Sequence, residues 1–370
     1  ARFMPCLLVQ GLAAPFDGPR ALPAGGPTPR ASAHSVNQSS LRLAPRQTFC
    51  DRRAAVHPKP DNRAMLRSLP APLTGICAFV LLVLNTLFWV PPLLVLAMLK
   101  LLLPFAAVRR ALSKALLHIA ESWIAGNNAW MQLTQHTEWD VQGLQSLQRD
   151  QWYLVNANHQ SWVDVLVLQR LLNRRIPLLK FFLKRELMWV PFMGLAWWAL
   201  DFPFMRRHSE DYLQKHPEMR GKDLETARRA CRKFAAQPTS VMNFLEGTRF
   251  SAAKQRQQHS PYRHLLKPKV GGLALALNTL GERFAAILDV TIVYPDGAPT
   301  FWQFLCGRVR RVVVRVRSLP VPQQLLQADY VANPRERVAF RRWVNEMWRH
   351  KDALIEEVLQ STAPQPSPAR

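Results

Sequence analysis

The chain has 370 residues, 48% of them hydrophobic, and its 49 Lys and Arg against 25 Asp and Glu give a formal net charge of +24. This length allows a sizeable core in one large domain or two small ones, and the five scattered cysteines, without a CxxC spacing, argue against a disulfide framework or a zinc site. The excess of positive charge indicates a polyanionic partner surface, either nucleic acid or anionic lipid.

The first 64 residues differ in composition from the rest of the chain. Residues 1–64 are rich in Pro, Ala, Arg and Ser without helical or strand periodicity, which is typical of a disordered extension. Because the chain begins with Ala and Met65 stands directly before a hydrophobic segment, an upstream start assignment or an incomplete gene model would explain this stretch. We leave it out of the fold argument, and we predict residues 361–370 as a disordered tail.

A long apolar segment begins next, and we predict residues 65–110 to be embedded in a membrane. No charged side chain occurs between Ser68 and Leu99, which is enough apolar length to enter a bilayer; a buried core helix or an uncleaved signal sequence are the alternatives. Pro91 and Pro92 lack backbone N–H donors and should break the helix into two arms. Positive charge lies on both sides of the segment. We therefore prefer a helical hairpin that enters one leaflet to a helix that spans the membrane.

Residues 111–360 have the composition of a soluble α/β domain. Apolar runs predict strands at residues 152–158, 178–184, 198–207, 239–249, where the strand runs into a loop, 285–295 and 310–321. Helical patterns predict helices at residues 162–173, 223–237, 270–282 and 336–359. This alternation predicts an α/β fold with a mixed sheet flanked by helices and with reactive groups at strand ends.

Four familiar catalytic signatures, GxSxG, HExxH, GxxxxGK[ST] and GxGxxG, are absent from the sequence. Their absence argues against a serine hydrolase with a nucleophile elbow, a zinc protease, a P-loop nucleotidase and a dinucleotide-dependent dehydrogenase. Candidate chemistry therefore has to be sought at the predicted strand ends.

The stretch VNANHQSWVD puts His159 and Asp164 five residues apart, where a strand gives way to a helix. The spacing alone is a weak signal, because in a continuous helix it would turn the two side chains roughly 140° apart. A loop between strand and helix would have to fold back to bring the carboxylate to the imidazole, as a catalytic dyad requires. The alternatives are an Asp that favours the helix dipole, a hydrogen-bonded strand-end His, a helix cap at Ser161 and plain packing for Trp162.

The stretch NFLEGTRF ends another apolar strand with Glu246, Gly247, Thr248 and Arg249. Gly allows a turn and a close approach to a ligand, Thr offers a hydroxyl, and Arg presents a fork of donors that suits phosphate. The alternative for a Glu close to an Arg is a local ion pair.

Two further strand ends carry weaker signals. DFPFMRR ends in Arg206 and Arg207, which point to opposite faces of a strand, so at most one reaches a shared site; a solvated strand end is the alternative. VTIVYPDG ends in a turn at Pro295, for which we favour a structural role.

Taken in order after an apolar segment, these four strand ends resemble the glycerolipid acyltransferase family, whose best-known members are the 1-acyl-sn-glycerol-3-phosphate (lysophosphatidate) acyltransferases. The resemblance covers roughly residues 75–300 and rests on NHQSWVD, FMRR, FLEGTRF and VTIVYP, which include an HX4D and an EGTR motif. It implies transfer of a fatty acyl chain from acyl-CoA or acyl-carrier protein to the free hydroxyl of a lysophospholipid, with 1-acyl-sn-glycerol 3-phosphate as the expected acceptor. The alternative acceptors are another lysophospholipid, glycerol 3-phosphate or a lipid A precursor.

The resemblance also implies roles for individual residues. His159 is the general base, and Asp164 orients its ring and stabilises the imidazolium that forms. The substrate-binding residues that it implies are Arg207, Glu246, Gly247, Thr248 and Arg249. Arg206 stands where many members carry an acidic residue, which leaves the head-group preference open. No metal and no cofactor are implied, and the acyl thioester is a co-substrate.

Partners and location follow from the same resemblance. We expect an anionic membrane as the working surface, the inner (cytoplasmic) membrane as the location, and an active site that faces the cytoplasm. A basic nucleic-acid-binding protein is the alternative from a different class, although no RNA- or DNA-binding module is recognisable in the sequence. Acyl-chain length, the choice of donor and the oligomeric state stay open.

Overall fold

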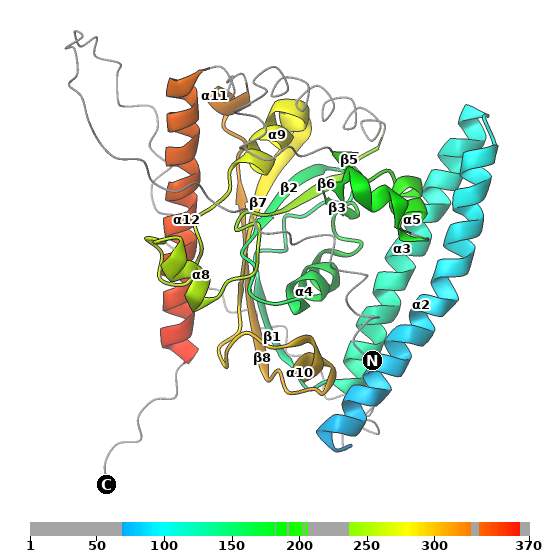
Figure 1. The fold of residues 1–370 in the computed structure, drawn as a ribbon, viewed down its shortest axis with the longest axis horizontal. Helices are drawn as coiled ribbons and strands as arrows, with labels where there is room; N and C mark the ends of the chain where they lie inside the picture. The colour runs from blue at the N-terminus through cyan, green and yellow to red at the C-terminus, as the bar shows by residue number, and fades with distance from the viewer. Residues whose placement is uncertain are drawn as a thin grey trace. The chain divides into compact units, whose positions relative to one another are not determined.

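A computed structural model of the chain describes residues 69–181, 183–190, 192–202, 204–205, 237–326 and 333–362 (Figure 1). The predictions for residues 1–64, for a helix at residues 223–237 and for Arg206 and Arg207 lie outside the described residues, as does nearly all of the predicted tail.

The centre of the fold is a six-stranded sheet with the strand order β1-β8-β7-β2-β6-β3. Its strands are β1 (Glu138–Gln142), β2 (Trp152–Ala157), β3 (Leu179–Phe181), β6 (Ser240–Phe244), β7 (Phe284–Val293) and β8 (Arg311–Leu319). Neighbouring strands run parallel except β7 and β8, which are antiparallel, so the predicted mixed sheet is confirmed. A second, two-stranded sheet pairs β4 (Leu183–Lys184) with β5 (Phe204–Met205).

Helices cover both faces of the large sheet, as predicted (Figure 1). They are α2 (Ala71–Leu102), α3 (Ala106–Thr134), α4 (Val163–Leu172), α5 (Met193–Ala199), α8 (Ala252–Gln257), α9 (Gly271–Leu280), α10 (Phe301–Leu305), α11 (Gln323–Leu326) and α12 (Pro334–Thr362). The 3-10 helices η3 (Arg185–Trp189) and η4 (Gly281–Arg283) complete the described elements. Successive strand residues point to opposite faces: Val155 belongs to the core under α3 and α4, whereas Leu154 belongs to the core under α9 and α12.

The register of the parallel strands brings their carboxyl ends together. Ala157 at the end of β2 pairs with Phe244 at the end of β6 on one side and with Val290 of β7 on the other. The segments that leave β2 and β6 therefore start side by side at one edge of the sheet, where ligand sites of open α/β sheets form.

The predicted helix break at Pro91 and Pro92 was wrong, because α2 runs through both prolines. The proline rings lie on the exposed side of α2, whereas Leu93 and Ala97 pack with Leu116 and Ala120 of α3 in one apolar cluster. This packing keeps the chain on a helical path despite the lost backbone hydrogen bonds. The chain reverses instead around Pro104, between α2 and α3, so the predicted limit between residues 110 and 111 falls inside α3.

Two predicted strands also differ from the structure. In the stretch 198–207, Trp198 and Ala199 close the helix α5, and the strand shrinks to the two residues of β5. The stretch 178–184 divides into β3 and β4, which pair in different sheets. In both cases contacts distant in sequence decide the backbone, because short apolar runs suit helices and strands alike.

Candidate active site

The segment that joins β2 to α4 is pinned to neighbouring elements by hydrogen bonds. The Asn158 side chain donates to the backbone oxygen of Ile292 and accepts from its N–H, both at 2.8 Å. The Ser161 hydroxyl donates to the Pro299 carbonyl at 2.5 Å and accepts from the N–H of Val163 at 3.1 Å. The segment thus has one defined path between the sheet and the helix.

This path brings His159 and Asp164 into contact. Nδ1 of His159 lies 2.9 Å from Oδ2 of Asp164, and the two residues are only 4% and 0% exposed. The same Oδ2 accepts the N–H of Gln160 at 2.6 Å and that of Ser161 at 2.9 Å, which is how the loop folds back on itself. The His159 ring also stacks on Phe244, with centroids 4.0 Å apart and planes 15° apart.

A residue that sequence reasoning missed completes the surroundings of Asp164. Tyr294, at the end of β7, donates its hydroxyl to Oδ1 of Asp164 at 2.7 Å. Burial first, and then the neighbouring Asp164 carboxylate, raise the pKa of Tyr294 well above its usual value, so the hydroxyl keeps its proton and stays a donor. The only sequence signal was its place between a buried strand and Pro295.

Glu246 lies behind the histidine and is fully buried. Its Oε1 accepts the backbone N–H of His159 at 2.7 Å, and its Oε2 accepts that of Leu266 at 3.0 Å. Burial raises the pKa of Glu246 to about 8, against the opposing effect of the two N–H donors and of Lys351. The ion pair with Arg249, considered as an alternative, is not formed between these two described residues; the carboxylate instead ties the end of β2 to the segment around Leu266.

The turn after β6 depends on a glycine. Gly247 has a φ of +65°, in the left-handed region that favours glycine, and a Cβ there would lie 2.9 Å from Cδ of Lys269. The Lys254 ammonium donates to the Thr248 hydroxyl at 2.8 Å and to the Arg249 carbonyl at 3.1 Å. These contacts hold the main chain of the turn from the side of α8.

Arg249 projects from this turn toward the histidine loop. Its guanidinium carbon lies 4.4 Å from the ring centroid of Trp162, which belongs to that loop. The N–H of Phe250 also donates to the His159 carbonyl at 2.7 Å, which joins turn and loop directly. Within the part of the chain that the structure describes, the Arg249 guanidinium has no hydrogen-bond or ion-pair partner. Its donors are therefore available to an anion.

The structure brings together six of the seven predicted site residues, and they form one continuous arrangement: His159, Asp164, Glu246, Gly247, Thr248 and Arg249. Arg207 falls outside the described residues, two positions after the end of β5. Three residues that sequence reasoning passed over or treated as packing take part as well: Trp162, Lys254 and Tyr294.

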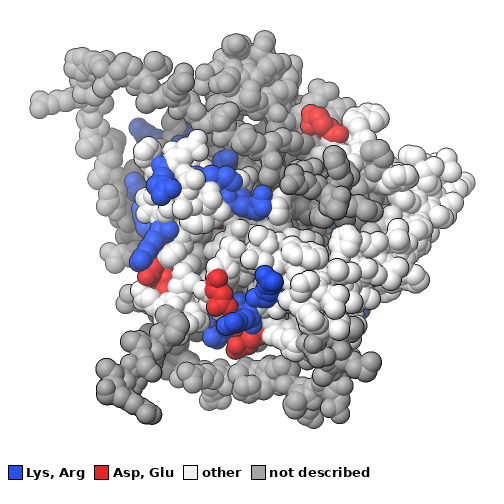
Figure 2. All heavy atoms as spheres, turned by 60° about the horizontal axis from the view of Figure 1, so that its bottom comes forward, with Lys and Arg blue, Asp and Glu red and all other residues white. Residues whose placement is uncertain are grey.

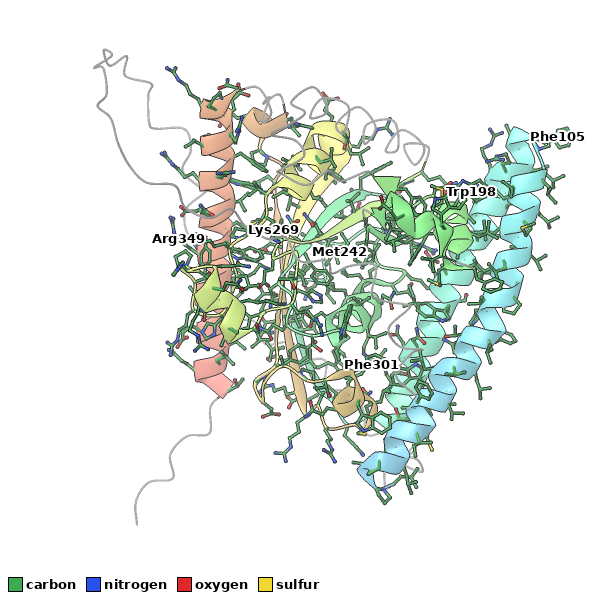
Figure 3. All side chains as sticks on the ribbon, viewed as in Figure 1. Phe105, Trp198, Met242, Lys269, Phe301 and Arg349 are labelled. Carbon is green, nitrogen blue, oxygen red and sulfur yellow. The ribbon has the colours of Figure 1, made fainter. Side chains whose placement is uncertain are left out.

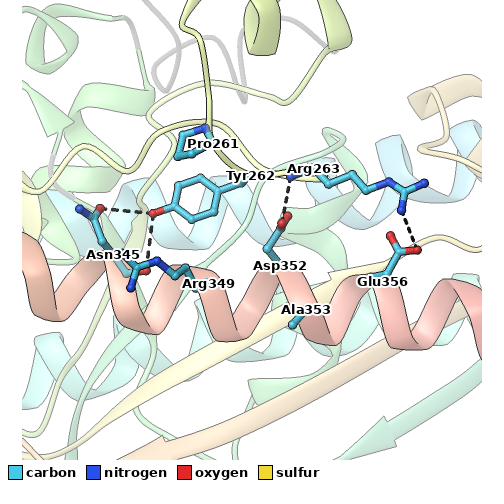
Figure 4. A pocket seen from close by; sticks show the side chains of 8 residues that line it. All are labelled: Pro261, Tyr262, Arg263, Asn345, Arg349, Asp352, Ala353 and Glu356. Atoms are coloured by element: carbon cyan, nitrogen blue, oxygen red, sulfur yellow. Dashed lines mark hydrogen bonds and ion pairs between the residues drawn. The ribbon is translucent and has the colours of Figure 1, made fainter.

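A separate cavity of about 440 Å³ lies between residues 261–263 and α12 (Figure 4). Its polar walls are paired with each other: the guanidinium of Arg263 contacts Glu356 at 2.9 Å, and the backbone N–H of Arg263 donates to Asp352 at 2.9 Å. None of the predicted site residues lines it. Over the described ranges, no group of three His, Cys, Asp or Glu side chains is placed to hold a metal ion.

The sequence around this arrangement is similar to that of known acyltransferases. A family model described as acyltransferase matches residues 138–295. The mouse (Mus musculus) 1-acyl-sn-glycerol-3-phosphate acyltransferase epsilon is 25% identical over 56% of this chain and 58% of its own length. The mouse gamma enzyme of the same name is 27% identical over 48% of this chain and 45% of its own length. The chain thus spans about half the length of these curated relatives.

Among solved structures, the crystal structure of the 1-acyl-sn-glycerophosphate acyltransferase PlsC from Thermotoga maritima is 17% identical. The alignment covers 75% of this chain and 97% of that chain, with a TM-score of 0.42. With this TM-score, the two structures share only a weak global likeness.

Proposed function

We propose that this chain, whose residues 138–295 match the acyltransferase family model, moves a fatty acyl chain from a thioester to the free hydroxyl of a lysophospholipid. The acceptor that we propose is 1-acyl-sn-glycerol 3-phosphate, and the donor is acyl-CoA or acyl-carrier protein. The observation that carries this proposal is the buried contact of His159 with Asp164, together with an Arg249 guanidinium that no described residue pairs with. The family match also argues against a basic nucleic-acid-binding protein.

His159 supplies the proton acceptor in this mechanism. With Nδ1 engaged by Asp164, Nε2 is the nitrogen left to take the proton of the acceptor hydroxyl. The hydroxyl oxygen attacks the thioester carbonyl, the new ester bond forms, and the C–S bond breaks as the thiolate leaves. The imidazolium returns its proton to the sulfur, while Asp164 holds the ring in place and stabilises its positive charge. No protein side chain becomes acylated.

Arg249 supplies the cation for the acceptor phosphate. The indole of Trp162 covers one face of the guanidinium and leaves the donors on its edge available, which is the geometry that binds phosphate oxygens in pairs. Lys254 adds a second positive charge at the same turn. Arg207 remains a proposed phosphate ligand from the sequence motif alone.

The membrane contact that we propose lies on α2. This helix is long and apolar enough to cross a bilayer, and it exposes many large apolar side chains. Those most exposed include Leu73, Ile76, Leu84, Leu87, Phe88 and Leu102. Phe105, at the turn between α2 and α3, is 64% exposed and projects away from the sheet (Figure 3). An apolar surface of this extent would promote aggregation if it faced water, so we propose that it contacts lipid.

Both ends of α2 are attached to the α/β domain. Near its start, a Cβ at Gly75 would lie 2.6 Å from the sulfur of Cys306 in the segment that follows α10. Near its end, the ammonium of Lys100, only 3% exposed, donates to the Asp201 carboxylate at 2.9 Å. A helix held at both ends by one body cannot cross a bilayer without that body, so we propose that α2 lies in one leaflet.

We further propose the cytoplasmic face of the inner membrane as the location. The scattered cysteines suit a reducing compartment, and the net charge of +24 suits an anionic leaflet. Figure 2 shows Lys and Arg side chains in groups on the face in view, with Asp and Glu side chains among them.

The experiment that tests the proposed function is an acyl-transfer assay with the detergent-solubilised protein. Labelled acyl-CoA and acyl-carrier protein are each offered with lysophosphatidate, other lysophospholipids and glycerol 3-phosphate. We expect label in phosphatidate with at least one donor. Release of free fatty acid without any acylated acceptor would overturn the proposal, and preferred labelling of another lysophospholipid would correct the acceptor.

A further inference from the structure

Trp162 contacts both groups that the proposed reaction needs. Its ring centroid is 6.4 Å from that of His159, in an edge-on arrangement with an interplanar angle of 82°. The guanidinium carbon of Arg249 lies 4.4 Å from the centroid of the Trp162 ring. One side chain thus contacts the proton acceptor and the phosphate-binding cation, which come from different strand ends.

The flexible side chain of an arginine on a turn needs a contact of this kind to stay in one position. Its side chain has several rotatable bonds, and ordering them on binding lowers affinity unless the free protein already holds the bound position. The Arg249 guanidinium has no hydrogen-bond partner among the described residues, so the indole face is what restrains it there. Stacking occupies the face of the guanidinium and leaves its edge donors for an anion.

The main chain of the turn is held separately. Lys254 donates to the Arg249 carbonyl and to the Thr248 hydroxyl, and Phe250 donates to the His159 carbonyl. Removal of the indole should therefore free the guanidinium without moving the turn. Trp162 is partly exposed and belongs to none of the buried apolar clusters, so its ring is not a core element.

We infer that Trp162 is a positioning residue that limits the separation between the sites for the acceptor's hydroxyl and its phosphate. The distance from the His159 ring to the Arg249 guanidinium cannot exceed the sum of the two contacts that Trp162 makes. This limit keeps the two sites close enough for one glycerophosphate acceptor to reach both, with its hydroxyl at His159 and its phosphate at Arg249. The inference rests on the proposed function and adds a determinant of acceptor choice to it.

The test compares Trp162→Leu and Trp162→Phe with the wild-type protein, using lysophosphatidate as acceptor. A cation–π contact of ordinary strength corresponds to roughly a 2- to 10-fold rise in acceptor KM when the ring is lost, with kcat nearly unchanged. Trp162→Phe keeps an aromatic face and should restore most of the affinity. If Trp162→Leu does not fold, as judged by circular dichroism, Trp162→Met replaces it, because methionine is a long and flexible apolar side chain without a ring.

A matched control and a double variant separate positioning from general packing. Arg170 lies 4.7 Å from the ring of Trp139, a similar pair formed by β1 and the last turn of α4. Trp139→Leu should leave acceptor KM unchanged. In a protein that already carries Arg249→Gln, adding Trp162→Leu should raise KM no further, since the indole would have no cation to place.

Several outcomes would overturn the inference alone: an unchanged KM in Trp162→Leu, an equal rise in Trp139→Leu, additive effects in the double variant, or a loss confined to kcat. In each of these the wild-type protein still acylates lysophosphatidate, so the proposed function stands. Absence of transfer to every lysophospholipid by the wild-type protein would overturn both.

Discussion

Glu246 accepts the backbone N–H of His159 at 2.7 Å, although the two residues are 87 positions apart in the sequence. Its other oxygen accepts the N–H of Leu266, and the carboxylate is fully buried. The Glu246 side chain therefore holds the backbone of His159 through a hydrogen bond and does not contact solvent. This and neighbouring contacts predict how particular substitutions should change stability, acyl transfer and the position of α2.

The buried carboxyl of Glu246 should make stability depend on pH. Burial raises its pKa from the usual 4.5 to about 8, so the folded protein binds this proton more tightly than the unfolded chain does. The contribution is fully present below about pH 4.5 and is lost as the pH rises through about 8, so stability falls across that window. Urea unfolding at a series of pH values should show a flatter dependence for Glu246→Gln than for the wild-type protein. Equal slopes would contradict the prediction.

Removal of the imidazole should stop acyl transfer. Because general base catalysis contributes roughly 10²- to 10⁴-fold, His159→Ala should lower kcat by at least this factor while co-sedimentation with anionic vesicles stays the same. His118→Ala, at an exposed position of α3, is the control and should transfer acyl chains normally. Wild-type turnover in His159→Ala would refute the assigned base.

Loss of the Tyr294 hydroxyl should affect both stability and rate. Tyr294→Phe leaves Oδ1 of the buried Asp164 without its donor, which costs about 1–3 kcal/mol of unfolding free energy. With Asp164 less restrained, kcat should fall while acceptor KM stays the same. Tyr262→Phe, which removes a longer hydroxyl contact to Asn345 at 3.3 Å, is the comparison and should not change kcat. A normal kcat in Tyr294→Phe would show that the hydroxyl is dispensable.

Replacement of the Arg249 guanidinium should weaken the binding of the acceptor. Arg249→Lys keeps the charge but loses paired donation to phosphate oxygens, so acceptor KM should rise about tenfold or more. Arg256→Lys on the exposed helix α8 makes the same chemical change elsewhere and should have no effect. An unchanged acceptor KM in Arg249→Lys would argue against the phosphate role.

The position of α2 can be tested with thiol reagents. In a background with the five native cysteines replaced by serine, Leu73→Cys and Phe105→Cys place one thiol near each end of α2. Because both ends are tied to the same domain, an impermeant reagent should reach both thiols from the cytoplasmic side only, or neither. Labelling of Phe105→Cys solely from the opposite side would show that the helix spans the bilayer.

Much of the fold could be predicted from local pattern. The alternating and apolar runs around Val155, Met242 and Leu288 identify the strands, because buried parallel strands need side chains that suit both faces. The His159 and Glu246 motifs stand at the ends of such strands, so a shared site could be expected. The prolines of α2 misled the same reasoning, since packing against α3 outweighed their local effect.

Residue type and short-range periodicity were enough to predict the candidate reactive groups, most of the elements that carry them and their order along the chain. Only the tertiary structure decided which groups meet: Glu246 with the backbone of His159, Tyr294 with Asp164, and Trp162 with Arg249. The physical reason is the parallel register of β2 with β6 and β7, which aligns strand ends that are far apart in the chain. That register arises from the packing of the whole sheet, and no local stretch of the sequence contains it.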